Sequence, residues 1–197
     1  MPRQLLHVGC GPLRRDRLPL CFQTQMWHEI RLDLNPQVKP DIIGSITDLS
    51  AIASESIDGI WSSHNLEHVN SFEVPIALSE FKRVLKPNGF ALITVPDLRA
   101  VARRIVNDSL EDTLYVSQAG PITPLDITFG HQKAIEQGNH FMAHRTGFTA
   151  KTLGHALLNT GFSEARVYES NRWALWAIAT MPMTSQSVFD ELAEVMF

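Results

Sequence analysis

From Gln4 to about Pro96 the chain alternates short apolar runs with helix-like segments, and this alternation constrains the fold more than any other feature. Such a rhythm is typical of a mostly parallel β-sheet covered by helices, which is an α/β architecture. Four of the apolar runs are predicted to be strands: Leu5–Val8, Glu29–Asp33, Ile57–Ser62 and Phe90–Val95.

The segments between these runs differ in helical character. Pro75–Leu85 carries apolar residues every three or four positions, the spacing of a helix with one buried face, and Lys86-Pro87-Asn88-Gly89 follows as a break. The segment from Pro12 to about Gln25 is only weakly periodic and includes Pro19. We therefore expect a helix start after the first strand, in a helix that is shortened or irregular.

After Pro96 the rhythm changes. A helix is predicted at about Leu98–Val106, and residues 107–147 then form a connection dotted with Gly, Pro, Asn and His. A connection of this length inside a compact domain is usually functional or contains a misjudged element. We interpret residues 107–147 as a lid over a binding site.

The last fifty residues regain order. Thr149 suits the N-cap of a helix through Leu158, and Phe162–Glu169 and Trp173–Met181 predict an antiparallel pair of strands. An apolar segment from Val188 onward is expected to form a helix that docks on its own domain or on a second copy. We expect a single domain over residues 1–197.

Composition bounds the function of this chain of 197 residues. The formal net charge of −4 disfavours a nucleic-acid binder whose affinity rests on neutralising many phosphates. Cys10 and Cys21 form neither a C-x-x-C pair nor a disulfide framework, which is typical of a reducing compartment. The longest mostly apolar stretch, Trp173–Met181, is about half of a membrane span. We expect a cytoplasmic monomer or homodimer without membrane or nucleic-acid partners.

A glycine turn and a distant acid predict a nucleoside site. Gly9-Cys10-Gly11-Pro12 follows a buried strand, and its glycines let the backbone approach a ligand closely. Arg14 stands where the dinucleotide fingerprint requires a third small residue, so a diphosphate is disfavoured. Asp33 ends the second strand, 33 − 11 = 22 positions after Gly11, where its carboxylate can accept hydrogen bonds from a ribose diol.

The loop after the expected third strand suits an adenine base. Asp48 in this loop can accept a hydrogen bond from the adenine amino group, and Leu34 and Leu49 can hold the ring between them. Together with Asp33, these residues point to an adenine nucleoside.

Five segments in order resemble a class I S-adenosylmethionine-dependent methyltransferase of the small bacterial "type 11" kind. They are LLHVGCGP, EIRLDLNP, PDIIGSITDLS, IDGIWSSHNLEHV and EFKRVLKPNGFALITVPDL. The resemblance covers nearly everything from Leu5 to Met181. It implies a Rossmann-like fold with helices on both faces of a seven-stranded sheet, strand order 3-2-1-4-5-7-6, and an antiparallel seventh strand.

The same resemblance implies S-adenosylmethionine as cofactor, S-adenosylhomocysteine as product, and direct in-line methyl transfer to a small-molecule acceptor. His7 replaces the usual acid of the first motif and Leu13 replaces a small residue, so a non-catalytic S-adenosylmethionine or nucleoside binder is the alternative. The cofactor-binding residues expected from the resemblance are His7, Gly9, Cys10, Gly11, Pro12, Asp33, Leu34, Thr47, Asp48, Leu49, Ser63 and His64.

His64-Asn65-Leu66-Glu67-His68 spells H-x-x-E-H, the inverted zincin signature. That signature belongs inside a long helix, whereas this copy follows a strand, so we expect no metal and no protease activity. In the family's pattern the stretch borders the methionyl end of the cofactor and the acceptor. Glu67 and His68 are therefore expected to face the substrate, unless they cap the next helix or pair with each other at the surface.

The expected lid holds an unusual share of the eight histidines. His131 and His144 are our candidates for the general base, because imidazole titrates near neutral pH. His140 and His144, four apart, would share a face of a helix and could bind a metal or flank an anion. The alternative is that they are hydrogen-bonded loop residues. The expected substrate-binding residues are Glu67, His68, Asp97, His140 and Arg145.

Other activities are less well matched. Ser63-His64-Asn65-Leu66 stands where amide and adenine N-methyltransferases carry Asn/Asp-Pro-Pro-aromatic, so a small metabolite is the expected acceptor. A nicotinamide oxidoreductase would share the first loop and Asp33 but requires the missing third glycine. An enzyme that modifies nucleic acid is disfavoured by the acidic net charge.

Overall fold

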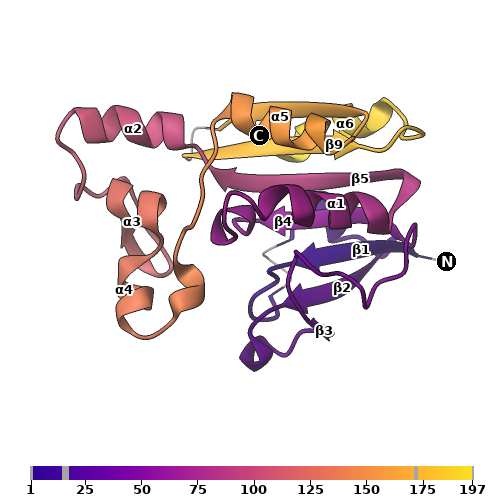
Figure 1. The fold of residues 1–197 in the computed structure, drawn as a ribbon, viewed down its shortest axis with the longest axis horizontal. Coiled ribbons are helices and arrows are strands. Elements are labelled where there is room, and N and C mark those ends of the chain that lie inside the picture. Colours follow the sequence, from indigo (N-terminus) through magenta and orange to yellow (C-terminus); the bar gives the residue numbers. More distant parts are fainter. Residues whose placement is uncertain (1, 15–17, 171–172, 197) are drawn as a thin grey trace.

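A seven-stranded sheet forms the centre of the protein (Figure 1). The computed structural model describes residues 2–14, 18–170 and 173–196. The strand order is β3-β2-β1-β4-β5-β9-β8, and β9 runs in the opposite direction to the other six strands of this sheet, so that its pairs with β5 and β8 are antiparallel. This confirms the predicted fold and strand order. The strands are β1 Arg3–Val8, β2 Trp27–Asp33, β3 Ile42–Ile43, β4 Ile57–Ser63, β5 Leu85–Pro96, β8 Glu164–Glu169 and β9 Ala174–Thr180.

Both faces of the sheet are buried, because alternate residues of the central strands enter two separate hydrophobic cores. On one face, Leu6 packs with residues of the helices α1, Val74–Val84, and α5, Ala150–Asn159. On the other face, Leu5 packs with residues of the short 3₁₀ helix Leu20–Phe22 and of α6, Ser187–Met196. Continuous burial of this kind is the reason that the central strands have nearly unbroken apolar sequences.

Most predicted helices form within one residue of their expected bounds. α1 ends at Val84, and α2 spans Leu98–Val106 as predicted. Thr149 is the N-cap of α5 and forms a capping box with Thr152. α6 confirms the C-terminal helix, which docks on its own domain through Phe189 and Leu192.

The segment after β1 departs from its prediction. Among its described residues, which exclude 15–17, no α-helix begins after the glycine turn, and the only helical element is the 3₁₀ turn at Leu20–Phe22. The expected helix start at Pro12 is therefore wrong there, whereas the expected irregularity is confirmed. Pro19 is the N-cap of the 3₁₀ turn, and it has no N–H to extend a longer helix.

Residues 107–147 contain more regular structure than their composition predicts. They fold into a hairpin, β6 Tyr115–Ser117 and β7 Gly120–Ile122, followed by α3 Pro124–Phe129, α4 Gln132–Glu136 and a 3₁₀ turn at His140–Met142. A capping box between Thr123 and Asp126 starts α3. Figure 1 shows α3 and α4 beyond the carboxyl ends of the parallel strands, below α2. That position suits a lid, which stays a prediction.

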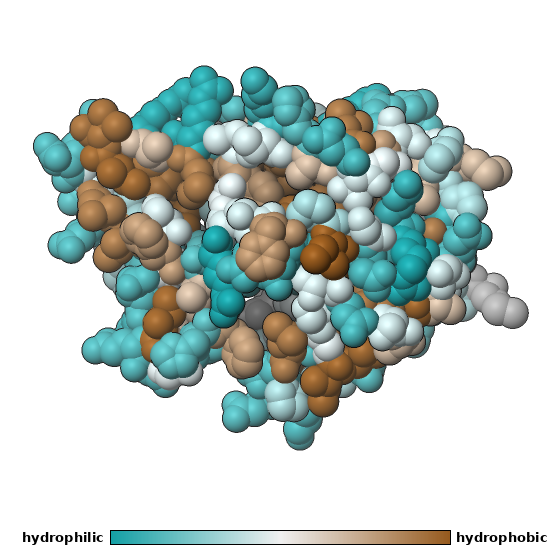
Figure 2. All heavy atoms as spheres, in the orientation of Figure 1, coloured by the Kyte–Doolittle hydropathy of each residue, from teal (hydrophilic) through white to brown (hydrophobic). Residues whose placement is uncertain are grey.

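Apolar side chains are exposed over α2 and α3 (Figure 2). Val106 is 82% exposed and Phe129 is 56% exposed. Within the described ranges, no helix is both long enough and apolar enough to cross a membrane.

Candidate functional site

A cavity of about 600 Å³ opens at the carboxyl ends of β1–β4. Open α/β sheets bind ligands at this edge, where the loops after neighbouring strands meet. Four loops and the end of the expected lid contribute. The lining residues discussed below are Gly9, Gly11, Pro12, Asp33, Leu34, Ile46, Thr47, Ser63, His64, Asn65, His68, His140, Phe141, Met142 and Arg145.

The glycine turn and Asp33 are joined directly. Gly9 and Gly11 have φ values of +61° and +59°, in the left-handed region that favours glycine. The Gly11 N–H donates to Asp33 Oδ2 over 2.8 Å, and the Asn35 N–H donates to Oδ1 over 2.8 Å. The carboxylate is thereby oriented beside the glycine turn at the cavity wall. Gly11 and Asp33 therefore lie side by side, as the predicted ribose site requires.

Arg31 supports this loop and was not predicted from the sequence. It is 7% exposed, and its guanidinium donates to the Gly11 carbonyl over 2.5 Å and to the Lys39 carbonyl over 2.9 Å. Arg31 therefore ties the glycine turn to the β2–β3 connection. The sequence does carry a signal for this role, because Arg31 lies two positions before Asp33 in a strand expected to be buried. A buried guanidinium requires hydrogen-bond acceptors nearby.

Only some of the residues predicted to contact the base line the cavity. Leu34, which is 51% exposed, and Thr47 line the cavity, and so does Ile46. Leu49 is 1% exposed and belongs to the core, so it does not face Leu34 across the cavity. Ile46 belongs to the same core, but it lines the cavity, whereas Leu49 does not.

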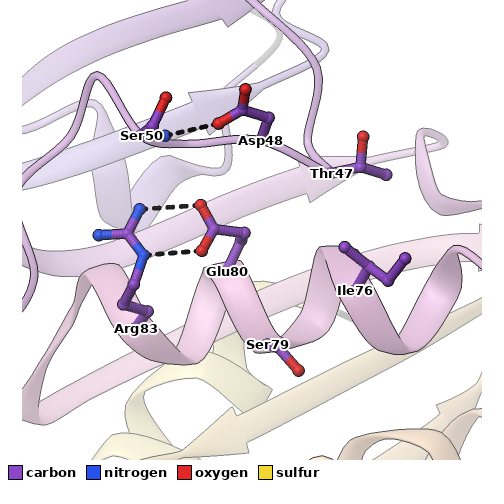
Figure 3. A pocket seen from close by; sticks show the side chains of 7 residues that line it. All are labelled: Thr47, Asp48, Ser50, Ile76, Ser79, Glu80 and Arg83. Atoms are coloured by element: carbon purple, nitrogen blue, oxygen red, sulfur yellow. Dashed lines mark hydrogen bonds and ion pairs between the residues drawn. The ribbon is translucent and has the colours of Figure 1, made fainter.

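Asp48 faces a different hollow, against α1 (Figure 3). Its carboxylate accepts the Ser50 N–H over 3.0 Å, and hydrogen bonds from the side chain and backbone of Ser50 lower the pKa of Asp48. Asp48 is outside the residues that line the main cavity, whereas Ser45 and Thr47 are the polar residues of this loop that line it.

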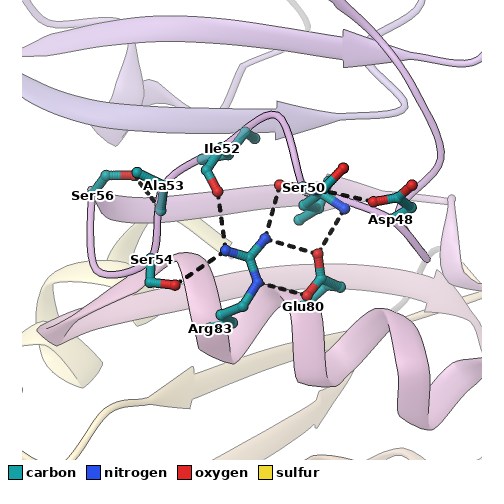
Figure 4. A network of polar contacts seen from close by, with 9 residues as sticks. Asp48, Ser50, Ile52, Ala53, Ser54, Ser56, Glu80 and Arg83 are labelled. Carbon is teal, nitrogen blue, oxygen red and sulfur yellow. Dashed lines mark hydrogen bonds and ion pairs between the residues drawn. The ribbon is translucent and has the colours of Figure 1, made fainter.

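An ion pair on α1 fixes the loop that carries Thr47 (Figure 4). Arg83 donates to Glu80 Oε1 over 2.7 Å, to the Leu49 carbonyl over 2.8 Å and to the Ile52 carbonyl over 3.0 Å. Glu80 Oε2 accepts the Leu49 N–H over 2.7 Å. Three of these hydrogen bonds join α1 to a loop that has no regular secondary structure of its own.

His7 and Cys10, both expected to bind cofactor, are buried away from the cavity. His7 is 5% exposed, and its Nδ1 lies 2.7 Å from Glu29 Oε1. The Cys10 side chain is buried, which raises the pKa of its thiol to about 11. Neither side chain is among the lining residues, so only the glycines and Pro12 of this motif border the cavity.

The loop after β4 brings Ser63, His64 and Asn65 to the cavity. His64 has a φ of +47°, and the Asn65 side chain lies so close to Gly9 that a Cβ there would be 2.7 Å from Asn65 Cγ. A side chain at Gly9 would therefore force the Asn65 side chain to move, and it would have to adopt a left-handed backbone conformation.

Glu67, His68 and His144 meet behind this loop. Glu67 is 0% exposed, and neither of its carboxylate oxygens accepts a hydrogen bond from a described residue. His64 Nδ1 lies 3.3 Å from Glu67 Oε1. Burial acts to raise the pKa of Glu67, but His64 and His68 outweigh it and hold that pKa below its usual range. The His68 and His144 rings are 5.0 Å apart at 70°.

The expected lid residues divide into two groups. His140, Phe141, Met142 and Arg145 line the cavity, whereas His144 reaches it only through contact with His68. His140 is in the 3₁₀ turn that ends at Met142, so His140 and His144 do not share the face of a helix. Burial lowers the pKa of His144 and favours its neutral form.

Asp97 and His131 lie outside the lining residues. The Asp97 carboxylate caps α2 by accepting the Arg99 N–H over 2.9 Å, and His131 occupies the N-cap position of α4. The structure therefore brings neither of them to the cavity wall, and their predicted roles in substrate binding and catalysis gain no geometric support.

Residues 6–93 match a family model described as a methyltransferase domain. Among solved structures, an S-adenosylmethionine-dependent methyltransferase from Methanosarcina mazei is 17% identical with a TM-score of 0.59, covering 91% of this chain and 92% of that chain. One from Archaeoglobus fulgidus is 15% identical with a TM-score of 0.58, covering 91% and 86%.

A third similar structure contains ligands. It is the Burkholderia thailandensis 1,6-didemethyltoxoflavin-N1-methyltransferase with bound 1,6-didemethyltoxoflavin and S-adenosylhomocysteine, which is 17% identical with a TM-score of 0.53 and covers 93% of this chain and 72% of that chain. No curated protein sequence matches this chain. The solved structures confirm the predicted fold over nearly the whole chain.

Proposed function

We propose that this chain, which matches a methyltransferase-domain model over residues 6–93 and has the fold of S-adenosylmethionine-dependent methyltransferases, binds S-adenosylmethionine in the cavity and methylates a small-molecule acceptor. The observation that carries the proposal is the position of Asp33 at the cavity wall, bonded to the backbone of the glycine turn. The solved relative with bound S-adenosylhomocysteine supports the same choice of cofactor.

Asp33 retains acceptor capacity for a ribose. Each of its oxygens accepts one backbone N–H, and an ionised carboxylate offers about four acceptor positions. Two ribose hydroxyls can therefore donate to it without displacing either bond. In this pose the base lies between Leu34 and Ile46 with Thr47 at its edge, and the methionyl end points toward Ser63 and His64.

The acceptor is expected to bind between the methionyl end and residues 140–145. Phe141 and Met142 offer apolar contacts, and Arg145 offers a positive charge that suits a carboxylate or phosphate on the acceptor. A sulfonium methyl is already activated, so catalysis consists mainly of aligning the nucleophile in line with the departing sulfur and excluding water. A small acceptor with an anionic group fits this arrangement.

A hydroxyl or protonated amine acceptor must also lose a proton. Of the two predicted bases, His144 is supported by its contact with His68, which borders the cavity, whereas His131 is not. We assign proton removal to the end of the cavity where His68 and His144 meet.

A non-catalytic S-adenosylmethionine-binding protein is the second candidate. It is favoured by the described part of the segment after the glycine turn, in which no α-helix presents N–H groups to the methionyl carboxylate, and by the burial of His7. Such a protein would bind the cofactor through Asp33 without turnover, so methyl transfer to a panel of small carboxylic acids and phosphates separates the two candidates.

Calorimetric titration with S-adenosylhomocysteine tests the binding step, with NADH as the control ligand. Asp33→Ala should weaken binding by at least about 100-fold, because each of two hydrogen bonds to a charged group contributes about 1.5–3 kcal/mol. Asp112→Ala, an exposed acid in the expected lid, should leave binding unchanged. Equal binding by wild type and Asp33→Ala, or tighter binding of NADH, would contradict the proposal.

A further inference from the structure

Three side chains with metal-binding atoms converge at the rear of the cavity. Glu67 and His68 come from the turn after β4, and His144 comes from the end of the expected lid, 76 residues later. One ligand atom from each lies within 4.8 Å of the others. We propose that Glu67, His68 and His144 bind a first-row divalent metal ion, with Zn²⁺ as the first candidate.

Hydrogen bonds at the two histidines prepare them as ligands. His68 Nδ1 lies 3.1 Å from the Ala143 carbonyl, and His144 Nδ1 lies 2.8 Å from the Ile127 carbonyl. Because a carbonyl oxygen only accepts, both Nδ1 atoms carry the proton, which leaves the Nε2 lone pairs free in the neutral rings. Metal-binding histidines usually have this arrangement, in which a backbone carbonyl fixes the tautomer and the orientation of the ring.

Glu67 is the independent observation that points to a cation. Its side chain is fully buried, and neither oxygen has a hydrogen-bond donor among the described residues. A buried carboxylate without donors is costly, and such groups in proteins are paired or coordinate metals. The imidazole of His64 lies 3.3 Å from one oxygen, and its side chain is 51% exposed. A divalent ion between Glu67 and the two imidazoles would satisfy all three groups.

The donor set selects the class of metal. Two imidazole nitrogens and one carboxylate oxygen suit Zn²⁺, Fe²⁺ or Mn²⁺ better than Ca²⁺ or Mg²⁺, which prefer all-oxygen ligands. Ligands about 2.0–2.2 Å from one ion are about 3.5 Å apart in a tetrahedron. The three side chains must therefore close by about 1 Å from their present spread of 4.8 Å, a shift within reach of side-chain rotation.

Three protein ligands leave a fourth position, as is typical of catalytic rather than structural zinc sites. His68 also lines the cofactor cavity, so a metal ion bound here would lie beside the space assigned to the acceptor. This part of the inference rests on the proposed function. A metal ion there would hold an acceptor oxygen and lower the pKa of an acceptor hydroxyl, and so replace imidazole as the means of proton removal.

The site differs from the inverted zincin signature that the sequence contains. In that signature two histidines of one helix bind the metal, and the glutamate polarises water. Here Glu67 itself is a ligand, His64 is not in the cluster, and the second histidine comes from a distant segment. The expectation of no metal was reasonable for the motif alone, and the tertiary contact with His144 is what changes it.

The test is titration of chelator-treated protein with Zn²⁺ by calorimetry, and with Co²⁺ by visible absorption, in the absence of any cofactor. We expect one equivalent to bind. Glu67→Gln and His144→Ala should each weaken Zn²⁺ binding by more than about 100-fold, because even the loss of a ligand's hydrogen-bonding partner costs about 10–100-fold. His155→Ala, an exposed histidine on α5, is the matched control and should bind as wild type does.

S-adenosylhomocysteine titration of the same variants separates this inference from the proposed function. Zn²⁺ binding that depends on Glu67 and His144 supports the site even if the chain binds no cofactor. Two results would overturn the metal site. One is that the protein binds S-adenosylhomocysteine but does not bind one equivalent of Zn²⁺ or Co²⁺. The other is that Glu67→Gln binds the metal as tightly as wild type does. Glu67→Asp keeps the negative charge and serves as the control for misfolding. It should bind Zn²⁺ more tightly than Glu67→Gln.

Discussion

At the residue scale, the surroundings of each histidine decide its role more than its place in the sequence does. His7 pairs with Glu29 inside the sheet, whereas backbone carbonyls hold His68 at the cavity and His144 directly behind it. His131 stands at a helix N-terminus outside the lining residues. The same side chain is therefore structural in one place and suited to binding in another.

Gly9 gives a sharp prediction at this scale. Gly9→Ala places a methyl group 2.7 Å from Asn65 Cγ at a residue with a φ of +61°. We expect the substitution to lower the free energy of unfolding by about 1–3 kcal/mol and to weaken cofactor binding, since the displaced loop carries Gly11. Urea unfolding and S-adenosylhomocysteine titration measure the two effects.

A double-mutant cycle identifies the cause. Asn65→Ala removes the atoms that the new methyl group would meet but leaves the backbone strain in place. Gly9→Ala should therefore cost less in the Asn65→Ala background than in wild type. An equal cost in both backgrounds would mean that strain alone, without the contact between the two loops, requires glycine here.

At the scale of elements, local hydrogen bonds explain why the expected lid is ordered. The Asp126 carboxylate accepts the Thr123 N–H over 3.0 Å and the Gln132 N–H over 2.9 Å. One side chain thus holds the start of both α3 and α4. The segment after β1 has no such capping group at its 3₁₀ turn, where Pro19 stands at the N-cap.

Asp126 predicts a pH dependence for this segment. Burial acts to raise its pKa, but hydrogen bonds from Gln132 and Thr123 outweigh it and lower the pKa from 3.8. The folded state thus favours the ionised form, so this stabilisation is present above the unfolded pKa and is lost as pH falls through the folded pKa. Asp126→Asn should cost about 1 kcal/mol at neutral pH, as for the loss of a helix cap.

Urea unfolding of both proteins from about pH 7 to about pH 3 is the measurement. The difference in stability between wild type and Asp126→Asn should narrow as the pH falls below 3.8. A difference that stays constant over this range would show that the charge of Asp126 does not stabilise the segment.

At the scale of the whole molecule, the cavity joins parts that are distant in sequence. The glycine turn at Gly9–Gly11 and the 3₁₀ turn at His140–Met142 line the same space. Arg145 is tied to the loop after β4, because its N–H donates to the Glu67 carbonyl over 2.8 Å. A ligand that fills this cavity contacts both the sheet edge and the expected lid.

Hydrogen exchange tests this coupling. Bound S-adenosylhomocysteine should slow amide exchange at residues 9–12 and 139–145 together, and should leave the β8–β9 pair unchanged. At a ligand concentration of about 100 times Kd, the folded state should gain about 2.7 kcal/mol, which a thermal shift detects. Protection of residues 9–12 alone would contradict a cavity that spans both parts.

The sequence by itself determined the strands at the centre of the sheet and the acid 22 positions after the glycine turn, and its resemblance to a known family implied the strand order. Buried strands such as Leu5–Val8 and the spacing between Gly11 and Asp33 are local patterns that burial and backbone geometry impose directly. The tertiary structure decided which loop side chains face the cavity: Leu49 turns into the core, and His144 packs against His68. These outcomes depend on packing between distant segments, because a loop has no fixed period that assigns its side chains to a face.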